Sequence, residues 1–150
     1  MLPLSRDHKP DDEDEYKRII EANGRVDKMR GEDGEQIGPY RVWLKDENVP
    51  GLAMSRSIGD KVAAQVGVIS EPEIFEKSLT EEDKFMVIAS DGIWEFLENE
   101  KVVELVVPFW ETNNPEGACQ KLIEMAVQFW ETEDEVIDDI TVIVVFLSVP

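Results

Sequence analysis

The sequence predicts an α+β fold in which helices pack on an antiparallel sheet. Three observations support this. Short apolar runs typical of strands occur at residues 40–44, 85–90 and 140–147. Longer stretches with helical spacing lie elsewhere in the chain, and the two kinds of element do not alternate regularly. A helix, an extended excursion, strands, two helices and a last strand are the order expected of layered α+β proteins. At 150 residues the chain can form one compact domain.

The first part of the chain is predicted to hold one helix, a polar excursion and a short strand. The helix opens at Pro10 and ends at Asn23 and Gly24, because glycine suits the left-handed stop of a helix. Residues 25–38 are polar and contain glycines, which predicts an exposed excursion that is mobile unless something docks on it. Residues 40–44 then look like a short strand whose side chains alternate between its two faces.

Further extended segments follow. Residues 66–69 and 73–79 are expected to be extended on either side of a proline. The run at residues 85–90 is almost wholly apolar, which predicts a strand buried on both faces. The last strand is expected at residues 140–147.

Two helices are predicted between these last strands. Asn99 is expected to cap the first, which Pro108 should stop because proline lacks the backbone N–H. Asn114 and Pro115 are the residues preferred at the cap and at the first position of the second helix.

The charge balance excludes some classes of partner. The chain carries 34 acidic and 15 basic residues, a formal net charge of −19. Such a surface repels nucleic acid and anionic lipid, so neither is expected as a partner. No apolar run approaches the ~20 residues that cross a bilayer. The lone Cys119 cannot form an internal disulfide, which favours a reducing compartment and an intracellular, cytoplasmic or nuclear location.

Carboxylates stand at the ends of two of the predicted strands. Asp91 directly follows the strand at 85–90, and Asp138 and Asp139 directly precede the last strand. If the two strands are antiparallel neighbours, these side chains meet at one rim of the sheet. Neighbouring carboxylates repel unless a cation or a shared proton lies between them, and hard oxygen donors suit Mg²⁺ or Mn²⁺. Asp91 could equally be a residue that starts the turn into the next helix.

Four separated motifs together resemble the metal-dependent protein serine/threonine phosphatases of type 2C, the PPM family. They are DHKP at residues 7–10, LAMSRSIGD at 52–60, ASDGIWE at 89–95 and DDITVIVV at 138–145. The resemblance implies that residues 1–150 are the C-terminal portion of a single catalytic domain, part of a layered α-β-β-α sandwich with antiparallel sheets. The family's earlier Asp-Gly-His-Gly and Gly-Asp-Ser-Arg motifs do not occur here. We therefore expect a fragment of a longer protein or one half of a split enzyme.

The resemblance also implies roles for the acidic residues. Asp91 and Asp138 look like metal ligands of the family's two-ion site. Asp139 stands where the family usually has asparagine, and it adds charge beside the site. Glu95 falls where many relatives have an aspartate that acts just behind the ligands.

Arg56 and Asp60 lie in a motif that anchors a mobile flap near the site in the family. For both residues a structural role, in a buried ion pair or a turn, is the stronger expectation. The excursion at about residues 26–43 resembles that flap, which relatives use near the protein substrate.

The activity that the resemblance implies is hydrolysis of phosphoserine and phosphothreonine in proteins. Two Mg²⁺ or Mn²⁺ ions would activate a water for direct attack on phosphorus. We expect the parent protein to be active on a phosphoprotein and the isolated chain to be inactive. The alternative is a catalytically silent interaction module, a pseudophosphatase or half of a split domain. Dimerisation, or pairing with the missing half, is a further expectation.

Overall fold

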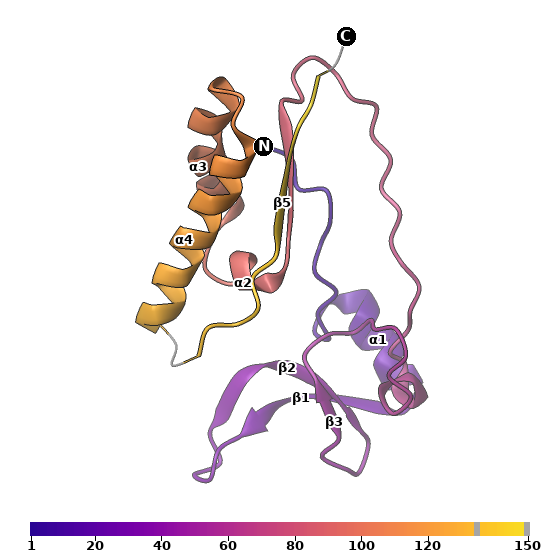
Figure 1. The fold of residues 1–150 in the computed structure, drawn as a ribbon. Helices are drawn as coiled ribbons and strands as arrows, with labels where there is room; N and C mark the ends of the chain where they lie inside the picture. Colours follow the sequence, from indigo (N-terminus) through magenta and orange to yellow (C-terminus); the bar gives the residue numbers. More distant parts are fainter. Residues whose placement is uncertain (134–135, 149–150) are drawn as a thin grey trace. The chain divides into compact units, whose positions relative to one another are not determined.

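The computed structural model describes residues 1–133 and 136–148 and divides into two compact units (Figure 1). The N-terminal unit is Leu4–Phe75, and the C-terminal unit is Glu76–Pro150 together with Met1–Pro3. Both units combine helices with antiparallel strands, so the α+β prediction is confirmed. In the ranges that the structure describes, no helix is both long and apolar enough to cross a membrane.

The N-terminal unit contains one α-helix and a three-stranded antiparallel sheet of order β1-β2-β3. In chain order its elements are α1 (Glu13–Glu21), β1 (Gly24–Arg30), β2 (Gln36–Leu44), β3 (Pro50–Leu52) and the short 3₁₀ helix η1 (Ala63–Val66). The buried apolar side chains that hold them together are Ile19, Val42, Ala63, Val66 and Val68.

The excursion predicted at residues 25–38 is largely exposed from residue 29 onward, as expected, but the chain forms a β-hairpin there rather than an irregular segment. β1 and β2 pair from Gly24 opposite Leu44 to Arg30 opposite Gln36. Gly34, with φ of 85°, provides the left-handed residue that the turn requires. The sequence did not predict the hairpin because much of the hairpin is exposed. Its strands therefore lack the apolar alternation of a half-buried sheet.

The end of α1 also differs from the prediction. The left-handed residue is Asn23, with φ of 59°, and Gly24 is instead the first residue of β1. A side chain at Gly24 could not be accommodated, since a Cβ there would lie 2.6 Å from Ile19 Cγ2 and 2.9 Å from the Val66 carbonyl oxygen. This glycine therefore allows helix, strand and η1 to approach closely.

The C-terminal unit places helices on one face of a two-stranded antiparallel sheet. Its elements are β4 (Phe85–Ala89), α2 (Asp91–Trp94), α3 (Asn99–Glu111), α4 (Pro115–Glu133) and β5 (Val142–Phe146). β4 pairs with β5 from Phe85 opposite Phe146 to Ala89 opposite Val142. Figure 1 shows α3 and α4 on the same side of these strands. The buried core between helices and sheet contains Ile93, Leu97, Val102, Val106, Ala118, Leu122, Ala126, Trp130 and Val144.

The prediction that β4 is buried on both faces is wrong. Phe85, Val87 and Ala89 pack against the core, as alternate residues of a strand should. Ile88 points the other way and is 51% exposed, and its cross-strand neighbour Ile143 is 52% exposed. The helices of this unit cover only one face, so an apolar sequence on both faces does not by itself bury both.

Of the three helix boundaries predicted from proline and asparagine, one is confirmed. Asn114 Oδ1 accepts a hydrogen bond from the Gly117 N–H at 3.0 Å, and Pro115 is the first residue of α4. Pro108, in contrast, lies inside α3, which continues to Glu111 and has Glu98 rather than Asn99 at its N-cap. Proline removes one helical hydrogen bond, but the helix goes on because its apolar side is held in the core.

The extended segments predicted at residues 66–69 and 73–79 form no named strand. Val66 ends η1, and Ile69 makes an isolated parallel bridge with Arg56. Residues 70–79 are exposed and without regular secondary structure.

Candidate functional site

The carboxyl end of β4 and the amino end of β5 lie together at one rim of the sheet. Ala89, the last residue of β4, pairs with Val142, the first residue of β5. Asp91, which follows β4, therefore lies at the same end of the sheet as Asp138 and Asp139, which precede β5. We call these three residues the acidic rim, and all three are exposed. The antiparallel pairing from which the sequence predicted this meeting is therefore confirmed.

The two sides of the acidic rim are in direct contact through their backbones. The Ser90 N–H donates to the Thr141 carbonyl at 2.9 Å, which continues the ladder beyond β4. Gly92 lies against Asp139, since a Cβ at Gly92 would be 2.5 Å from the Asp139 carbonyl oxygen. Only glycine fits here without moving the backbone of the opposite segment.

The apolar core fixes the backbone that carries Asp91. Trp130, from α4, donates its indole N–H to the Gly92 carbonyl at 2.9 Å, and this contact is buried. Trp94 donates its own indole N–H to the Ala89 carbonyl at 3.0 Å. Ile93 is fully buried between these contacts. Asp91 is thus an exposed carboxylate on a rigid support.

The donor set of the acidic rim fits part of a magnesium or manganese site. Its side chains offer only carboxylate oxygens, the donors that these ions prefer. Asp138 also orders its own loop, because its Oδ1 accepts a hydrogen bond from the Asp139 N–H at 2.7 Å. Within the ranges that the structure describes, however, no group of three or more His, Cys, Asp or Glu side chains is placed to hold a metal. The rim is therefore an open set of carboxylates and not a closed cage.

Glu95 lies on the same side of α2 as Asp91. It follows Asp91 by one helical turn, and its N–H donates to the Asp91 carbonyl at 2.8 Å. Residues four apart on a helix are neighbours on its surface, and both carboxylates are exposed. The structure therefore brings a further carboxylate to the rim, and its role behind the ligands stays a prediction.

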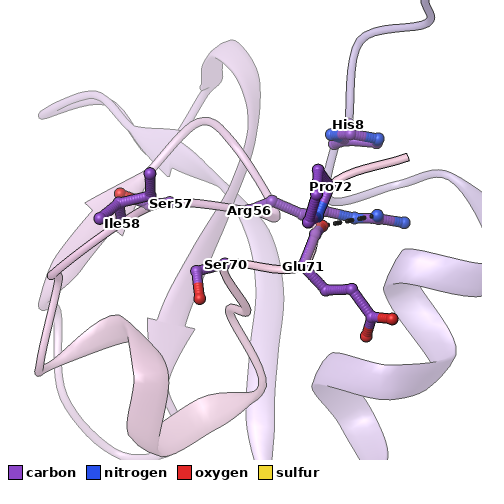
Figure 2. A pocket seen from close by; sticks show the side chains of 7 residues that line it. All are labelled: His8, Arg56, Ser57, Ile58, Ser70, Glu71 and Pro72. Carbon is purple, nitrogen blue, oxygen red and sulfur yellow. Dashed lines mark hydrogen bonds between the residues drawn. The ribbon is translucent and has the colours of Figure 1, made fainter. Parts of the chain in front are cut away.

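Arg56 and Asp60 belong to the N-terminal unit and make structural contacts there. The Arg56 guanidinium donates from Nε to Glu15 Oε1 at 3.0 Å. It also donates from Nη1 to the Glu71 carbonyl at 3.0 Å, the contact drawn in Figure 2. Asp60 Oδ1 accepts from the N–H groups of Val62 and Ala63 at 3.1 and 2.9 Å, which orders the turn before η1. Anchoring of a flap near a metal site stays a prediction for both.

The buried carboxylate of Glu15 was missed by the sequence interpretation. It accepts hydrogen bonds from Arg18 at 2.6 Å, from the Ser55 hydroxyl and from Arg56. Burial alone would raise the pKa of Glu15, but the hydrogen bonds from these three partners outweigh it and hold the pKa well below its ordinary value. One signal was available, because Glu15 lies one turn before the buried Ile19 and so shares its helix face.

A cavity of about 180 Å³ lies beside this network in the N-terminal unit. Figure 2 shows the side chains that line it: His8, Arg56, Ser57, Ile58, Ser70, Glu71 and Pro72. His8 Nε2 is buried, finds no hydrogen-bond partner among the described residues and lies 3.5 Å from a Glu73 carboxylate oxygen. The one guanidinium that lines the cavity, that of Arg56, is already engaged by Glu15 and by the Glu71 carbonyl.

Comparison with known proteins defines the class of fold and then the family. A solved serine-threonine phosphatase 2C from Toxoplasma gondii matches with a TM-score of 0.80 at 24% identity, covering 95% of this chain and 46% of that one. This likeness shows a common fold. A family model described as protein phosphatase 2C matches residues 2–134. "Probable protein phosphatase 2C 72" of Arabidopsis thaliana is 40% identical over 98% of this chain and 43% of its own length. "Probable protein phosphatase 2C 12" of Oryza sativa subsp. japonica is 45% identical over 70% of this chain and 26% of its own length.

The chain belongs to the protein phosphatase 2C family, as its four motifs predicted. It spans less than half the length of the curated relatives it matches. Phosphatases of this family are metal-dependent, which agrees with the oxygen-donor chemistry of the acidic rim.

Proposed function

We propose that this chain forms the C-terminal portion of the catalytic domain of a metal-dependent phosphatase acting on phosphoserine and phosphothreonine in proteins. The observation that carries the proposal is the meeting of Asp91 and Asp138 at one rim of the β4–β5 sheet. Membership of the protein phosphatase 2C family and the names of the plant relatives support the reaction class.

The residues of the rim have separate tasks in this proposal. Asp91 and Asp138 would hold Mg²⁺ or Mn²⁺ through carboxylate oxygens. A metal bound there lowers the pKa of a coordinated water and neutralises charge on the phosphoryl oxygens. Asp139 adds negative charge beside the ligands, and Glu95 provides a carboxylate one turn along α2 that can accept hydrogen bonds from water.

The same proposal predicts that these 150 residues alone are inactive. The rim offers too few ligands to enclose an ion, and the family's Asp-Gly-His-Gly motif is not in the sequence. We propose that the longer family members supply the remaining ligands from residues that these 150 do not include. Dimerisation or pairing with a further half-domain, and the intracellular location, stay predictions from the sequence.

The test is a phosphatase assay of the full-length protein with Mn²⁺ and a phosphothreonine peptide. Asp91→Asn and Asp138→Asn should each lower kcat/KM by roughly 100-fold or more, since even groups behind metal ligands cost about 10- to 100-fold. Glu116→Gln, at an exposed acid in the first turn of α4, is the matched control and should leave activity unchanged. Full activity in either aspartate variant contradicts the proposal. An inactive wild-type protein that still binds a partner would favour the interaction module.

A further inference from the structure

We infer that Ser90 is a positioning residue whose hydroxyl clamps the two sides of the acidic rim together, an inference that rests on the proposed function. Ser90 precedes Asp91 in the chain, and its partners lie beside Asp138. The clamp therefore sets the distance between the two proposed ligands, which come from segments far apart in sequence.

The Ser90 hydroxyl uses both its donor and its acceptor on the opposite segment. Oγ donates to the Asp139 carbonyl at 3.1 Å and accepts from the Thr141 N–H at 3.0 Å. These partners are 49 and 51 residues away along the chain. With the backbone bond from the Ser90 N–H to the Thr141 carbonyl, one residue makes three hydrogen bonds across the rim.

The local role of a serine at this position does not explain these contacts. Ser90 is the N-cap residue of α2, with the extended φ of −76° and ψ of 171°. At an N-cap a serine hydroxyl ordinarily accepts a hydrogen bond from an N–H of the first helical turn. Here the hydroxyl makes no such cap bond to the helix that follows. Instead of capping α2, the hydroxyl bonds to Asp139 and Thr141 in the segment that precedes β5.

The contact with Asp139 reaches the Asp138 carboxylate through the backbone of one residue. The Asp139 carbonyl accepts from Ser90, while the Asp139 N–H donates to Asp138 Oδ1 at 2.7 Å. Asp139 is therefore held on both sides, by Ser90 and by Asp138. Moving this backbone would move the Asp138 carboxylate relative to Asp91.

Gly92 and Trp130 make a complementary contribution. Gly92 allows the Asp139 backbone to approach closely, and the Trp130 indole N–H donates to the Gly92 carbonyl from the core. Close approach alone leaves the segment that carries Asp138 free to slide along the rim. The Ser90 hydroxyl, bonded to groups on both sides of Ile140, prevents that sliding.

The test compares Ser90→Ala with Ser90→Thr, which keeps the hydroxyl, and with Ser78→Ala, an exposed serine of the same unit outside the rim. Without metal, NMR-detected amide exchange should become about 5- to 10-fold faster at Thr141 in Ser90→Ala, because its N–H loses the Ser90 hydroxyl as acceptor, a hydrogen bond worth about 1 kcal/mol. Exchange at Val87 and Val144, in the strand centres, should not change. Ser90→Thr and Ser78→Ala should both behave as wild type.

The second measurement is Mn²⁺ binding by the full-length protein, monitored through paramagnetic broadening of the amides next to Asp91 and Asp138. Ser90→Ala should raise the Mn²⁺ Kd by about 10- to 100-fold, and Ser90→Thr should restore it. Exchange that is unchanged, or that rises equally at Val87 and Val144, overturns the clamp. An unchanged Kd overturns its positioning role. If the wild-type protein shows no broadening at the rim, the proposed function fails. Faster exchange in Ser90→Ala that is confined to residues 139–141 would still support the clamp.

Discussion

The two units of the chain are stabilised by different interactions. In the N-terminal unit a small apolar cluster lies beside a fully buried carboxylate, Glu15, with Arg18, Ser55 and Arg56 around it. In the C-terminal unit a larger apolar core lies between the sheet and α2, α3 and α4. The acidic rim sits on this second kind of support, with its carboxylates outside the core and its backbone pinned by Trp130.

The two kinds of core should respond differently to substitution. The ion network depends on specific partners, because Glu15 joins α1 to Ser55 and Arg56, which lie 40 and 41 positions further along the chain. Arg18 extends it to the carbonyls of Ser55 and Gly67 at 3.0 and 2.8 Å. Removing one partner of such a network leaves an uncompensated buried charge, whereas an apolar core tolerates substitutions that conserve volume. The N-terminal unit should therefore be the more sensitive to charge and acid.

The largest effect should come from Glu15→Ala. The change leaves the guanidinium groups of Arg18 and Arg56 without their carboxylate, which should cost about 3–5 kcal/mol in the free energy of unfolding. Trp43 is the only tryptophan of the N-terminal unit, and the C-terminal unit has Trp94, Trp110 and Trp130. With 5-fluorotryptophan, ¹⁹F NMR can follow urea unfolding of each unit separately, and the Trp43 midpoint should fall most.

The matched control is Leu122→Ala, which truncates a fully buried side chain of the C-terminal core. It should cost about 2–5 kcal/mol, and the midpoints of the C-terminal tryptophans should fall instead. If both substitutions shift the urea midpoints of all four tryptophans equally, the two units unfold as one. That result would contradict separate stabilisation of the two units.

Acid should weaken the N-terminal unit more than the C-terminal unit, where a hydrogen bond from Lys77 lowers the pKa of Asp83 alone among the described groups. The folded pKa of Glu15 is held below its ordinary value of 4.5, so its contribution to stability is complete above about pH 4.5 and declines as pH falls further. Arg6 likewise lowers the pKa of Asp14 and of Glu73 in this unit. Relief of repulsion within a chain of net charge −19 acts on both units, so the difference between their urea midpoints is the informative quantity.

That difference should grow as pH is lowered from about 7 to about 3, with Trp43 unfolding at progressively lower urea than Trp130. Glu15→Gln provides the control, because its side chain cannot titrate and should flatten most of the pH dependence. A wild-type Trp43 midpoint that follows Trp130 at every pH would show that the buried carboxylate contributes no acid sensitivity.

The sequence was most informative where local chemistry decides the structure. The α+β class, the cap at Asn114 and the meeting of Asp91 with Asp138 and Asp139 could all be predicted, because they depend on residue preferences and on strand order. The buried Glu15 and the exposed Ile88 could not. Both depend on which neighbours cover a side chain, and a charged residue on a core face looks like a solvated one until its partners are known. Pro108 was misplaced for a similar reason, since packing overrode its local preference.

The smallest effect should come from Asn114→Ala, within the less charge-sensitive unit. Asn114 Oδ1 accepts from the Gly117 N–H, so the substitution leaves a helix N–H of α4 without its side-chain partner. Such caps contribute about 1 kcal/mol, and the midpoints of Trp94, Trp110 and Trp130 should fall slightly while Trp43 stays unchanged. Asn114→Ser keeps an acceptor and should restore the midpoints, which separates loss of the cap from a change in packing. If Asn114→Ala destabilised the unit as much as Leu122→Ala, the apolar core would contribute less than the comparison of the two units requires.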